Sequence, residues 1–397
     1  LEKASGRDLD EWGRLWLETA GVNTLKPELA VGGDGTISSF AILQSATEGQ
    51  PTLRPHRLAV GFYNLNGSGK LERVHREELD VDGGRTDVPA LAGLAQPDLI
   101  LLNDDDLAYA KVRLDPASLA TATAHLKDFS QSLPRTLVWG SAWDAARDGE
   151  TPARGYVELI LANIAEESDS SVILVQLRQL ATTLNFYVAA EHKEATAVAA
   201  ADRLWELASG VPAGSDAQLQ FVKSYALLAR SASQLDTVAG LLEGSLALEG
   251  LAVDQDLRWE LITSLVAGGR AGQEKIDAEL EHDNTATGQN AAALAKAAIP
   301  TPEAKAAAWD SIVVKGELSN ALQGSAVTGF TRVLDTSLLE PYAEKYFDAV
   351  PGIVKERTHA LAQQIVVGLY PAQLTTQATI DRTDEFLAAL PEDSAAL

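Results

Sequence analysis

The sequence predicts a multidomain, mainly α protein in which a small antiparallel β-sandwich precedes an irregular α-superhelix of paired helices. Two patterns support this fold class. Short alternating apolar segments with Gly-rich turns occupy residues 30–114, and apolar positions at three- and four-residue spacing occupy residues 116–390. The length of 397 residues is enough for two or three domains. We expect the regions 1–27, 28–115 and 116–397.

The first expected element is an amphipathic helix over residues 4–20. Trp12, Leu15 and Trp16 recur at helical spacing, and Gly21 stands where a helix C-cap belongs. Nothing in this sequence precedes the helix to cover its apolar side, so we expect it to be the last helix of a missing domain. An ordinary N-terminal helix packed on the β-rich region after it is the alternative. If the apolar side is exposed, it favours an artificial dimer.

The strands expected in residues 30–114 follow the alternation of apolar side chains. These positions are Phe40 and Ile42; Leu58, Val60 and Phe62; Leu79 and Val81; Leu99–Leu102; and Tyr109–Leu114. The turns between them are Gly32–Gly35, Asn66–Gly69 and Asp82–Gly84, whose Asn-Gly and Asp-Gly pairs supply positive φ angles. Six or seven short strands without an intervening helix predict a small antiparallel sandwich or barrel.

Residues 116–390 are expected to be helical almost throughout. Asp115-Pro116, Thr151-Pro152 and Thr301-Pro302 each pair an N-cap side chain with proline at the first helical position. We expect roughly fifteen helices, or about six to eight pairs at ~35–45 residues per pair. Since no crisp repeat signature is present, an irregular superhelix of HEAT-like pairs is favoured over a regular array, with a closed bundle as the alternative. The concave face of such a superhelix usually covers another domain or binds a ligand.

The composition excludes several classes of function. There are 32 Lys+Arg against 56 Asp+Glu, a net charge of -24, which disfavours nucleic-acid binding. No apolar run reaches the ~18–20 residues of a membrane span. With no Cys, the chain has no disulfides, thiolate metal sites or cysteine nucleophile. That favours a reducing, cytoplasmic location, although an exported protein is possible. The absence of Met indicates a fragment, replaced methionines or methionines omitted from the sequence.

No zinc-hydrolase helix is present. The six histidines are His56, His75, His125, His192, His282 and His359, and the closest two are 19 residues apart. A zinc-hydrolase helix needs two histidines one turn apart with a Glu beside the first. A zinc site assembled from scattered His and carboxylates is the alternative, and we interpret each lone His as a surface or capping residue.

Three further motifs are more simply structural than catalytic. Gly67–Lys70 resembles the tail of a phosphate loop but lacks its upstream Gly and its Ser or Thr, so we expect a hairpin turn. Asn103–Asp106 lacks the pattern of a calcium loop, so a solvated β-turn is favoured over a calcium site. Trp139 and Trp143, one helical turn apart, indicate core packing rather than a ligand platform.

Adjacent carboxylates are also poor candidates. Glu77-Glu78 and Glu166-Glu167 point in different directions in either secondary structure, so they do not form acid–base dyads. We therefore assign no catalytic, cofactor-binding or metal-ligating residue from the sequence. The cofactor expectation for this chain is likewise none.

Four segments carry a resemblance to a known family, and they occur in the family's order. The segments are Gly6–Gly21, Leu101–Lys111, Arg135–Glu150 and Glu340–Phe347. The sequence resembles the C-terminal half of bacterial M1-family zinc aminopeptidases of the aminopeptidase N type. The resemblance implies the tail of a catalytic domain, then a β-sandwich, then an α-superhelix, and covers essentially the whole chain.

In that family the zinc ligands, the amine-binding loop and the catalytic Tyr lie in a domain that this sequence lacks. The resemblance therefore implies zinc in the parent chain, inactivity of this portion alone, and a helical domain that encloses the active-site chamber and restricts access to peptides. The implied partners are the missing N-terminal β and catalytic domains and peptide substrates. The alternatives are a stand-alone helical-repeat interaction protein with a β-sandwich cap and a hydrolase using dispersed carboxylates.

Overall fold

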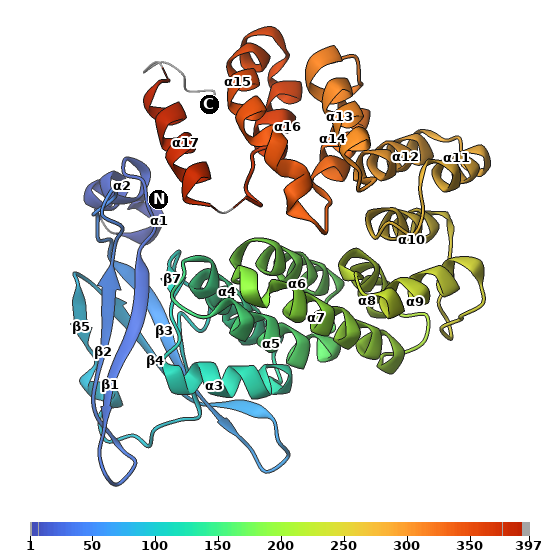
Figure 1. Ribbon diagram of the computed structural model, residues 1–397. Helices are drawn as coiled ribbons and strands as arrows, with labels where there is room; N and C mark the ends of the chain where they lie inside the picture. The colour runs from blue at the N-terminus through green and yellow to red at the C-terminus, as the bar shows by residue number, and fades with distance from the viewer. Residues whose placement is uncertain (1, 7, 375, 391–397) are drawn as a thin grey trace. The chain divides into compact units, whose positions relative to one another are not determined.

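The chain divides into two compact units, Leu1–Thr183 and Leu184–Leu397, in a computed structural model (Figure 1). The structure describes residues 2–6, 8–374 and 376–390. Arg7 of the first expected helix and residues 391–397 of the expected helical region lie outside the described residues. Within them, no helix is both long and apolar enough to cross a bilayer.

The helix expected over residues 4–20 is two short helices, α1 (Glu2–Ser5) and α2 (Asp10–Leu17), so that prediction is wrong. Gly6 adopts a positive φ of 68° after α1 and stops the helix. The carboxylate of Asp8 then accepts a hydrogen bond from the Asp10 backbone N–H at the start of α2. Gly21 is not the C-cap either, because α2 already ends at Leu17.

A buried arginine fastens α2 to the sandwich. The guanidinium of Arg54 donates to the carbonyl oxygens of Leu15 (2.8 Å), Thr19 (3.1 Å) and Ala20 (2.9 Å). These carbonyls lie in the last turn of α2 and just beyond it, where no backbone N–H is available to them. A cation at the C-terminal end of a helix is also favoured by the helix dipole. This contact agrees with the alternative stated above, in which the N-terminal helix packs on the β-rich region that follows it.

In the described part of the chain, seven strands form two sheets, which confirms the predicted β-sandwich (Figure 1). The strands are β1 (Thr24–Val31), β2 (Ile37–Ser45), β3 (His56–Leu65), β4 (Leu71–Val81), β5 (Arg85–Asp87), β6 (Leu99–Leu102) and β7 (Lys111–Val112). Their order is β5-β2-β1-β7 in one sheet and β4-β3-β6 in the other. All pairs are antiparallel except β1 with β7, which is parallel. The last expected strand, Tyr109–Leu114, shortens to Lys111–Val112.

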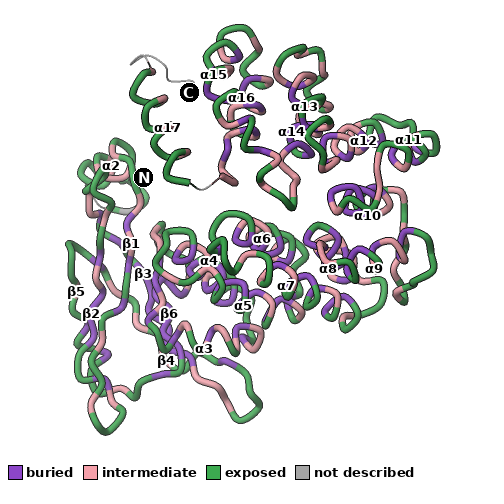
Figure 2. The backbone as a smooth tube through the Cα atoms, viewed as in Figure 1, coloured by how far each residue is buried: buried purple, intermediate pink, exposed green. Residues whose placement is uncertain are grey.

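The central strand β3 is buried on both faces. Leu58, Val60 and Phe62 lie in the core between the two sheets. Ala59, on the opposite face, is also fully buried, and α3 (Pro116–His125) packs against the neighbouring strand β6. Figure 2 shows β6 and most of β3 buried. The sandwich is thus covered by a helix on one outer face, which the alternation of apolar residues alone did not indicate.

The remaining helices of the first unit pack on α3 and β7. They are α4 (Ser132–Arg147), α5 (Ala153–Asn163) and α6 (Ser170–Thr182), and α4 contacts both α5 and α6. The Asp115 N-cap is confirmed, because its carboxylate accepts from the backbone N–H groups of Ala117 and Ser118. The Thr151 N-cap is wrong: α5 starts at Ala153 and no side chain caps it.

The second unit is all helical. Its α-helices are α7 (Ala190–Gly210), α8 (Asp216–Leu228), α9 (Ala232–Glu243), α10 (Gln255–Ala267), α11 (Gln273–His282), α12 (Ala286–Ala298), α13 (Pro302–Trp309), α14 (Asn320–Thr331), α15 (Glu340–Glu356), α16 (His359–Gly368) and α17 (Gln377–Ala388). Helices α8, α10, α12, α14 and α16 each contact the next in that row. Alternate helices of a helical repeat pack this way, so the predicted fold class of a sandwich followed by paired helices is confirmed.

A buried lysine joins two helices of this row. Lys305, at the start of α13 after the Thr301 N-cap, donates from Nζ to the carbonyl oxygens of Ala297 (2.6 Å) and Phe330 (2.8 Å). These acceptors lie in the last turns of α12 and α14, where carbonyl groups lack intrahelical partners. Burial lowers the pKa of Lys305 to about 7. The lysine therefore ties the C-terminal ends of both helices to α13.

We expect the substitution Gly61→Ala to destabilise the β-sandwich. A Cβ at this position in β3 would lie 2.3 Å from Asp104 Oδ2 and 2.9 Å from the Tyr63 ring. Displacing the buried Asp104 should lower the free energy of unfolding by about 2 kcal/mol or more. Urea titration followed by circular dichroism measures the loss. Gly67→Ala in the β3–β4 turn, where an added Cβ meets nothing within 4 Å, is the matched control.

A second prediction concerns His56, which packs edge-on against Trp16 of α2. Burial first, and then the nearby Arg54 charge, lower the pKa of His56 from 6.5 to about 4. The unfolded chain therefore takes up this proton below about pH 6.5, whereas the folded chain does so only near pH 4. Stability is complete above pH 6.5 and falls toward pH 4, by at most about 3 kcal/mol.

Unfolding measured between pH 4.5 and 7.5 checks this dependence. His56→Phe should flatten the part of the curve that His56 contributes, and His192→Gln, a change at an exposed histidine, is the matched control. Equal slopes for the wild type and His56→Phe would show that the buried ring is not the titrating group.

Candidate functional site

The acidic turn Asn103–Asp106 follows β6 as predicted, but it is not solvated. Asp104 is buried, and its Oδ1 accepts a 2.5 Å hydrogen bond from the Tyr63 hydroxyl. Arg73 donates to Oδ2 of Asp104 and to Oδ1 of Asp105, both at 2.8 Å. The prediction of a solvated turn is therefore wrong, because two side chains from the neighbouring strands reach the turn. The same contacts occupy the carboxylates that a calcium ion would need.

These contacts also perturb the groups involved. Burial, followed by the hydrogen bond to Asp104, raises the pKa of Tyr63 well above its usual range. The hydrogen bond from Arg76 lowers the pKa of Asp105. A tyrosine hydroxyl and two carboxylates matched by arginines hold the turn on the sheet, which is a structural rather than a catalytic arrangement.

The other motifs identified in the sequence have structural roles. Gly67–Lys70 closes the β3–β4 hairpin, with Gly69 at a φ of 76°, which confirms the turn. Trp139 is buried in the core as predicted. The Trp143 ring packs 5.5 Å from that of Tyr156.

The adjacent carboxylates face different surroundings. Glu167 is buried and accepts two 2.8 Å hydrogen bonds from Arg135, whereas Glu166 is exposed. Glu78 accepts from Arg57 and Arg76. Each carboxylate that forms these contacts is matched to arginine rather than to a second acid.

The described residues do not form a zinc site. Only Glu2, Asp8 and Asp10 among them place three metal-binding groups close together, and all three are exposed. Two of these carboxylates already accept hydrogen bonds from backbone N–H groups. Zinc sites of hydrolases use imidazole nitrogen ligands, and this cluster contains none.

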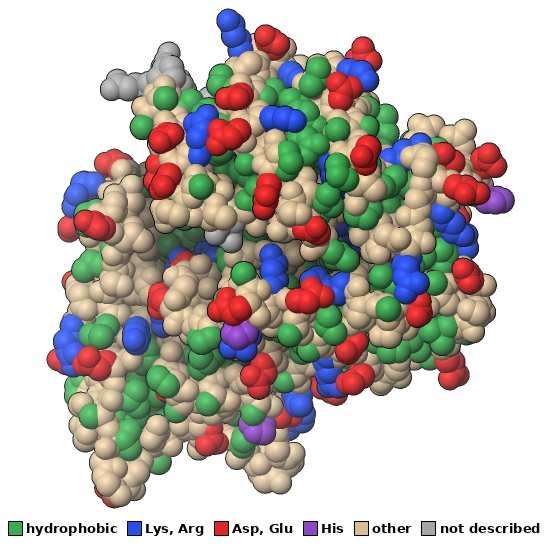
Figure 3. All heavy atoms as spheres, viewed as in Figure 1, with side chains coloured by type: hydrophobic (Ala, Val, Ile, Leu, Met, Phe, Trp, Pro, Cys, Tyr) green, Lys and Arg blue, Asp and Glu red, His purple; other side chains and the backbone are tan. Residues whose placement is uncertain are grey.

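Charge is distributed evenly on the face shown in Figure 3. Basic and acidic side chains are interspersed there, and no concentrated basic area appears on that face. A nucleic-acid surface needs basic side chains gathered on one face. The net charge of -24 points the same way.

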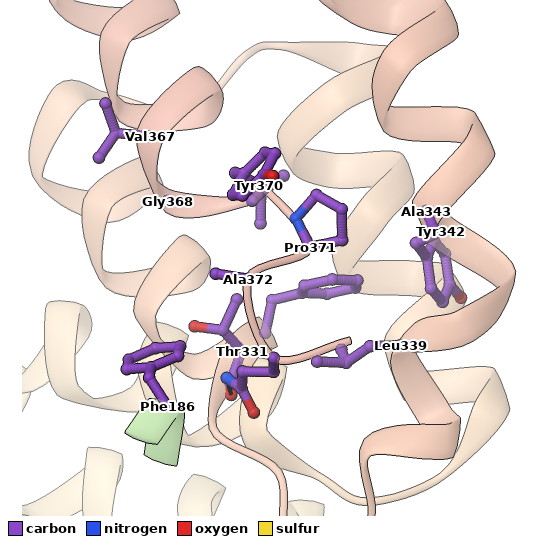
Figure 4. Close-up of a pocket in the computed structure, with 13 residues that line it drawn as sticks. Phe186, Thr331, Leu339, Tyr342, Ala343, Val367, Gly368, Tyr370, Pro371 and Ala372 are labelled. Carbon is purple, nitrogen blue, oxygen red and sulfur yellow. Dashed lines mark hydrogen bonds between the residues drawn. The ribbon is translucent and has the colours of Figure 1, made fainter. Parts of the chain in front are cut away.

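The second unit contains an apolar pocket of about 110 Å³ (Figure 4). We call it the apolar pocket; it lies between the end of α14, the start of α15 and the segment after α16. Tyr342 and Leu339 line one part, and Tyr370 and Pro371 another, with Phe186 at its edge. The aromatic rings leave an uncharged depression suited to an apolar side chain.

A smaller polar pocket adjoins the apolar pocket, since Thr331 and Gln373 line both. Its volume is about 60 Å³, and its charged lining residues are Arg230 and Arg332. Arg230 pairs with the exposed Glu194 at 3.3 Å. The Arg332 side chain forms no hydrogen bond or ion pair with the residues that the structure describes; burial lowers its pKa, and the charge of Glu260 opposes this effect. This arginine is therefore available to an anion. Nothing in the local sequence distinguishes it from a surface arginine.

The sequence of this chain is similar to that of a known protein and to a known domain family. The chain is 49% identical over its whole length to aminopeptidase N of Streptomyces lividans. It spans 47% of that protein, about half its length. The family of ERAP1-like C-terminal domains matches residues 99–397, which begin at β6 and include the helices from α3 to α17.

The match to aminopeptidase N confirms the resemblance drawn from the four sequence segments. The match to the domain family covers three quarters of the chain, including the row of helices in the second unit. On this basis the chain belongs to the family of ERAP1-like C-terminal domains.

Proposed function

We propose that the chain is the non-catalytic C-terminal portion of a zinc aminopeptidase that removes N-terminal amino acids from peptides. The observation that carries this proposal is the 49% identity along the whole chain to an aminopeptidase N of which it spans 47%. The sequence has no His-Glu-x-x-His segment. We therefore place zinc and bond hydrolysis in the other half of the parent chain, where this portion supplies no ligand.

In this proposal the helical region encloses the active-site chamber and restricts access to peptides. Helices α8, α10, α12, α14 and α16 of the second unit form a row in which each contacts the next, and stacked helices of this kind build extended binding surfaces. A cover of this kind excludes folded proteins and keeps bulk water from the metal. The proposed domains remain residues 1–27, 28–115 and 116–397.

The proposed partners are the N-terminal β and catalytic domains of the parent chain and peptide substrates. Trp12 and Leu17 of α2 are 39% and 76% exposed and offer an apolar contact to the preceding domain. When no domain covers them, these side chains favour the artificial dimer expected from the sequence. Sedimentation of the Trp12→Glu variant tests this, with Leu174→Glu as the control. A cytoplasmic location is supported by the absence of Cys.

The apolar pocket and the adjoining polar pocket provide the chemistry for contact with a peptide. The apolar pocket accepts an apolar side chain, and Arg332 is free to pair with a carboxylate of the same peptide. An arginine–carboxylate pair shielded from water is among the stronger polar contacts. We propose that long peptides touch this surface while their N-terminus lies at the zinc of the parent chain.

We expect Arg332→Ala in the parent enzyme to raise KM for long peptides about tenfold, since one charge-assisted contact is lost. Hydrolysis of an aminoacyl-anilide, which is too short to reach this surface, should not change. Arg270→Ala is the matched control, because Arg270 is exposed and already paired with Asp236.

Steady-state kinetics on both substrates measures the effect. Equal changes in peptide and anilide hydrolysis would mean that Arg332 acts on the fold rather than on the peptide. Unchanged kinetics on both would remove this surface from the peptide path.

A further inference from the structure

A cavity of about 220 Å³ lies in the first unit, where β1, the end of β7, α3, α4 and the α4–α5 loop meet. Its polar lining side chains are Lys26, Arg113, Ser141, Glu150 and Thr151, and we call it the Arg113 cavity. Apolar residues of α3 and α4 form the rest of its wall. None of these residues belongs to the pockets of the second unit.

Arg113 is held rigidly at this cavity. It is only 5% exposed, and its Nε and Nη2 donate to the two carboxylate oxygens of Glu150 at 2.9 and 2.7 Å. Nη2 also donates to Asp148 at 2.6 Å. The remaining nitrogen, Nη1, is buried and has no hydrogen-bond acceptor. A buried charged donor without an acceptor lowers the stability of the fold, so a ligand that accepts a hydrogen bond from Nη1 would be stabilising.

The cavity has more donors than acceptors. Besides Nη1 of Arg113, the Lys26 ammonium and the hydroxyls of Ser141 and Thr151 line it without a hydrogen bond or ion pair to any residue in the described part of the chain. The one carboxylate in the lining, Glu150, is already engaged by Arg113. Two cationic groups and two hydroxyls therefore line the space, and its one carboxylate already accepts from Arg113.

The local charges also favour an anion. Around the cavity, Lys26, Lys111 and Arg113 carry three positive charges, and Asp148 and Glu150 carry two negative charges. Asp148 is shared between Lys111 and Arg113. The Arg113 hydrogen bond is the main cause that lowers the pKa of Glu150, and Lys26 adds a smaller attraction. One positive charge thus remains unmatched, and Lys26 is the group that carries it.

We propose that the Arg113 cavity binds a small oxyanion, either inorganic phosphate or a small carboxylate. A water takes up about 30 Å³ of liquid, so the space is large for a single water molecule. An oxyanion there accepts from Nη1 of Arg113 and from Ser141 or Thr151, and pairs with Lys26. Because Lys26 belongs to β1 and Ser141 to α4, the bound anion bridges the sandwich and the first helices.

The test measures thermal unfolding and isothermal titration of the whole chain with sodium phosphate or sodium acetate, each against sodium chloride at equal ionic strength. We expect saturable binding and a rise in Tm with phosphate, acetate or both, beyond the chloride control. Comparing the affinities for phosphate and acetate shows which of the two oxyanions the cavity prefers. Absence of a saturable effect with both would overturn the proposal and leave the cavity to water.

The variants avoid the risk that loss of Arg113 prevents folding. Lys26→Met, at an exposed position, should weaken binding about tenfold, since it removes one charge pair. Ser141→Ala should weaken it less. Lys70→Met, at an exposed lysine of the β3–β4 turn in the same unit, is the matched control and should bind as the wild type does. Binding that is unchanged in both Lys26→Met and Ser141→Ala would overturn this site.

Discussion

Buried arginines hold the junctions of the first unit, and the arrangement of its elements depends on them. Arg54 satisfies the carbonyls at the end of α2, Arg113 joins the end of β7 to the α4–α5 loop, and Arg135 holds Glu167 before α6. Where one element ends and another begins, backbone or carboxylate acceptors are left without regular partners. A planar guanidinium with five donors can satisfy several of them at once.

This construction has a clear energetic consequence. Each buried guanidinium has lost its hydration, so it is stable only while its acceptors stay in place. Removing Glu167 or Glu150 would leave an unmatched charge at a junction. Among these three arginines, only Arg113 has a buried donor nitrogen without an acceptor, and for that reason its cavity is the place where a ligand would add most to the fold.

Local signals in the sequence predicted those features that depend on neighbouring residues. The Asp115 and Thr301 N-caps and the Gly67–Lys70 turn are of this kind, as is the helical periodicity of residues 116–390. The break of the first helix at Gly6 and the absent Thr151 cap are local failures, whereas the failure at Asp104 arises from contacts distant in the chain. Asp104 resembles a surface residue until Tyr63 and Arg73 of neighbouring strands are placed beside it. In the same way, Lys305 and Arg332 look like exposed charges on amphipathic helices. A local signal does exist for one pair of buried polar residues. Ser215 and Ser231 each precede by three residues a glutamine, Gln218 or Gln234, whose side chain is buried and donates to a carbonyl of α7.

The β-sandwich, the row of helices and the 49% identity to about half of an aminopeptidase N support the proposal of a non-catalytic portion of such an enzyme. The most direct test of this proposal compares the purified 397-residue chain with the parent polypeptide, by zinc content and by release of amino acids from an aminoacyl-anilide with and without chelator. We expect stoichiometric zinc and chelator-sensitive release from the parent, and neither from the chain alone. Chelator-sensitive release by the chain itself would contradict the assignment and place the catalytic ligands among its own residues.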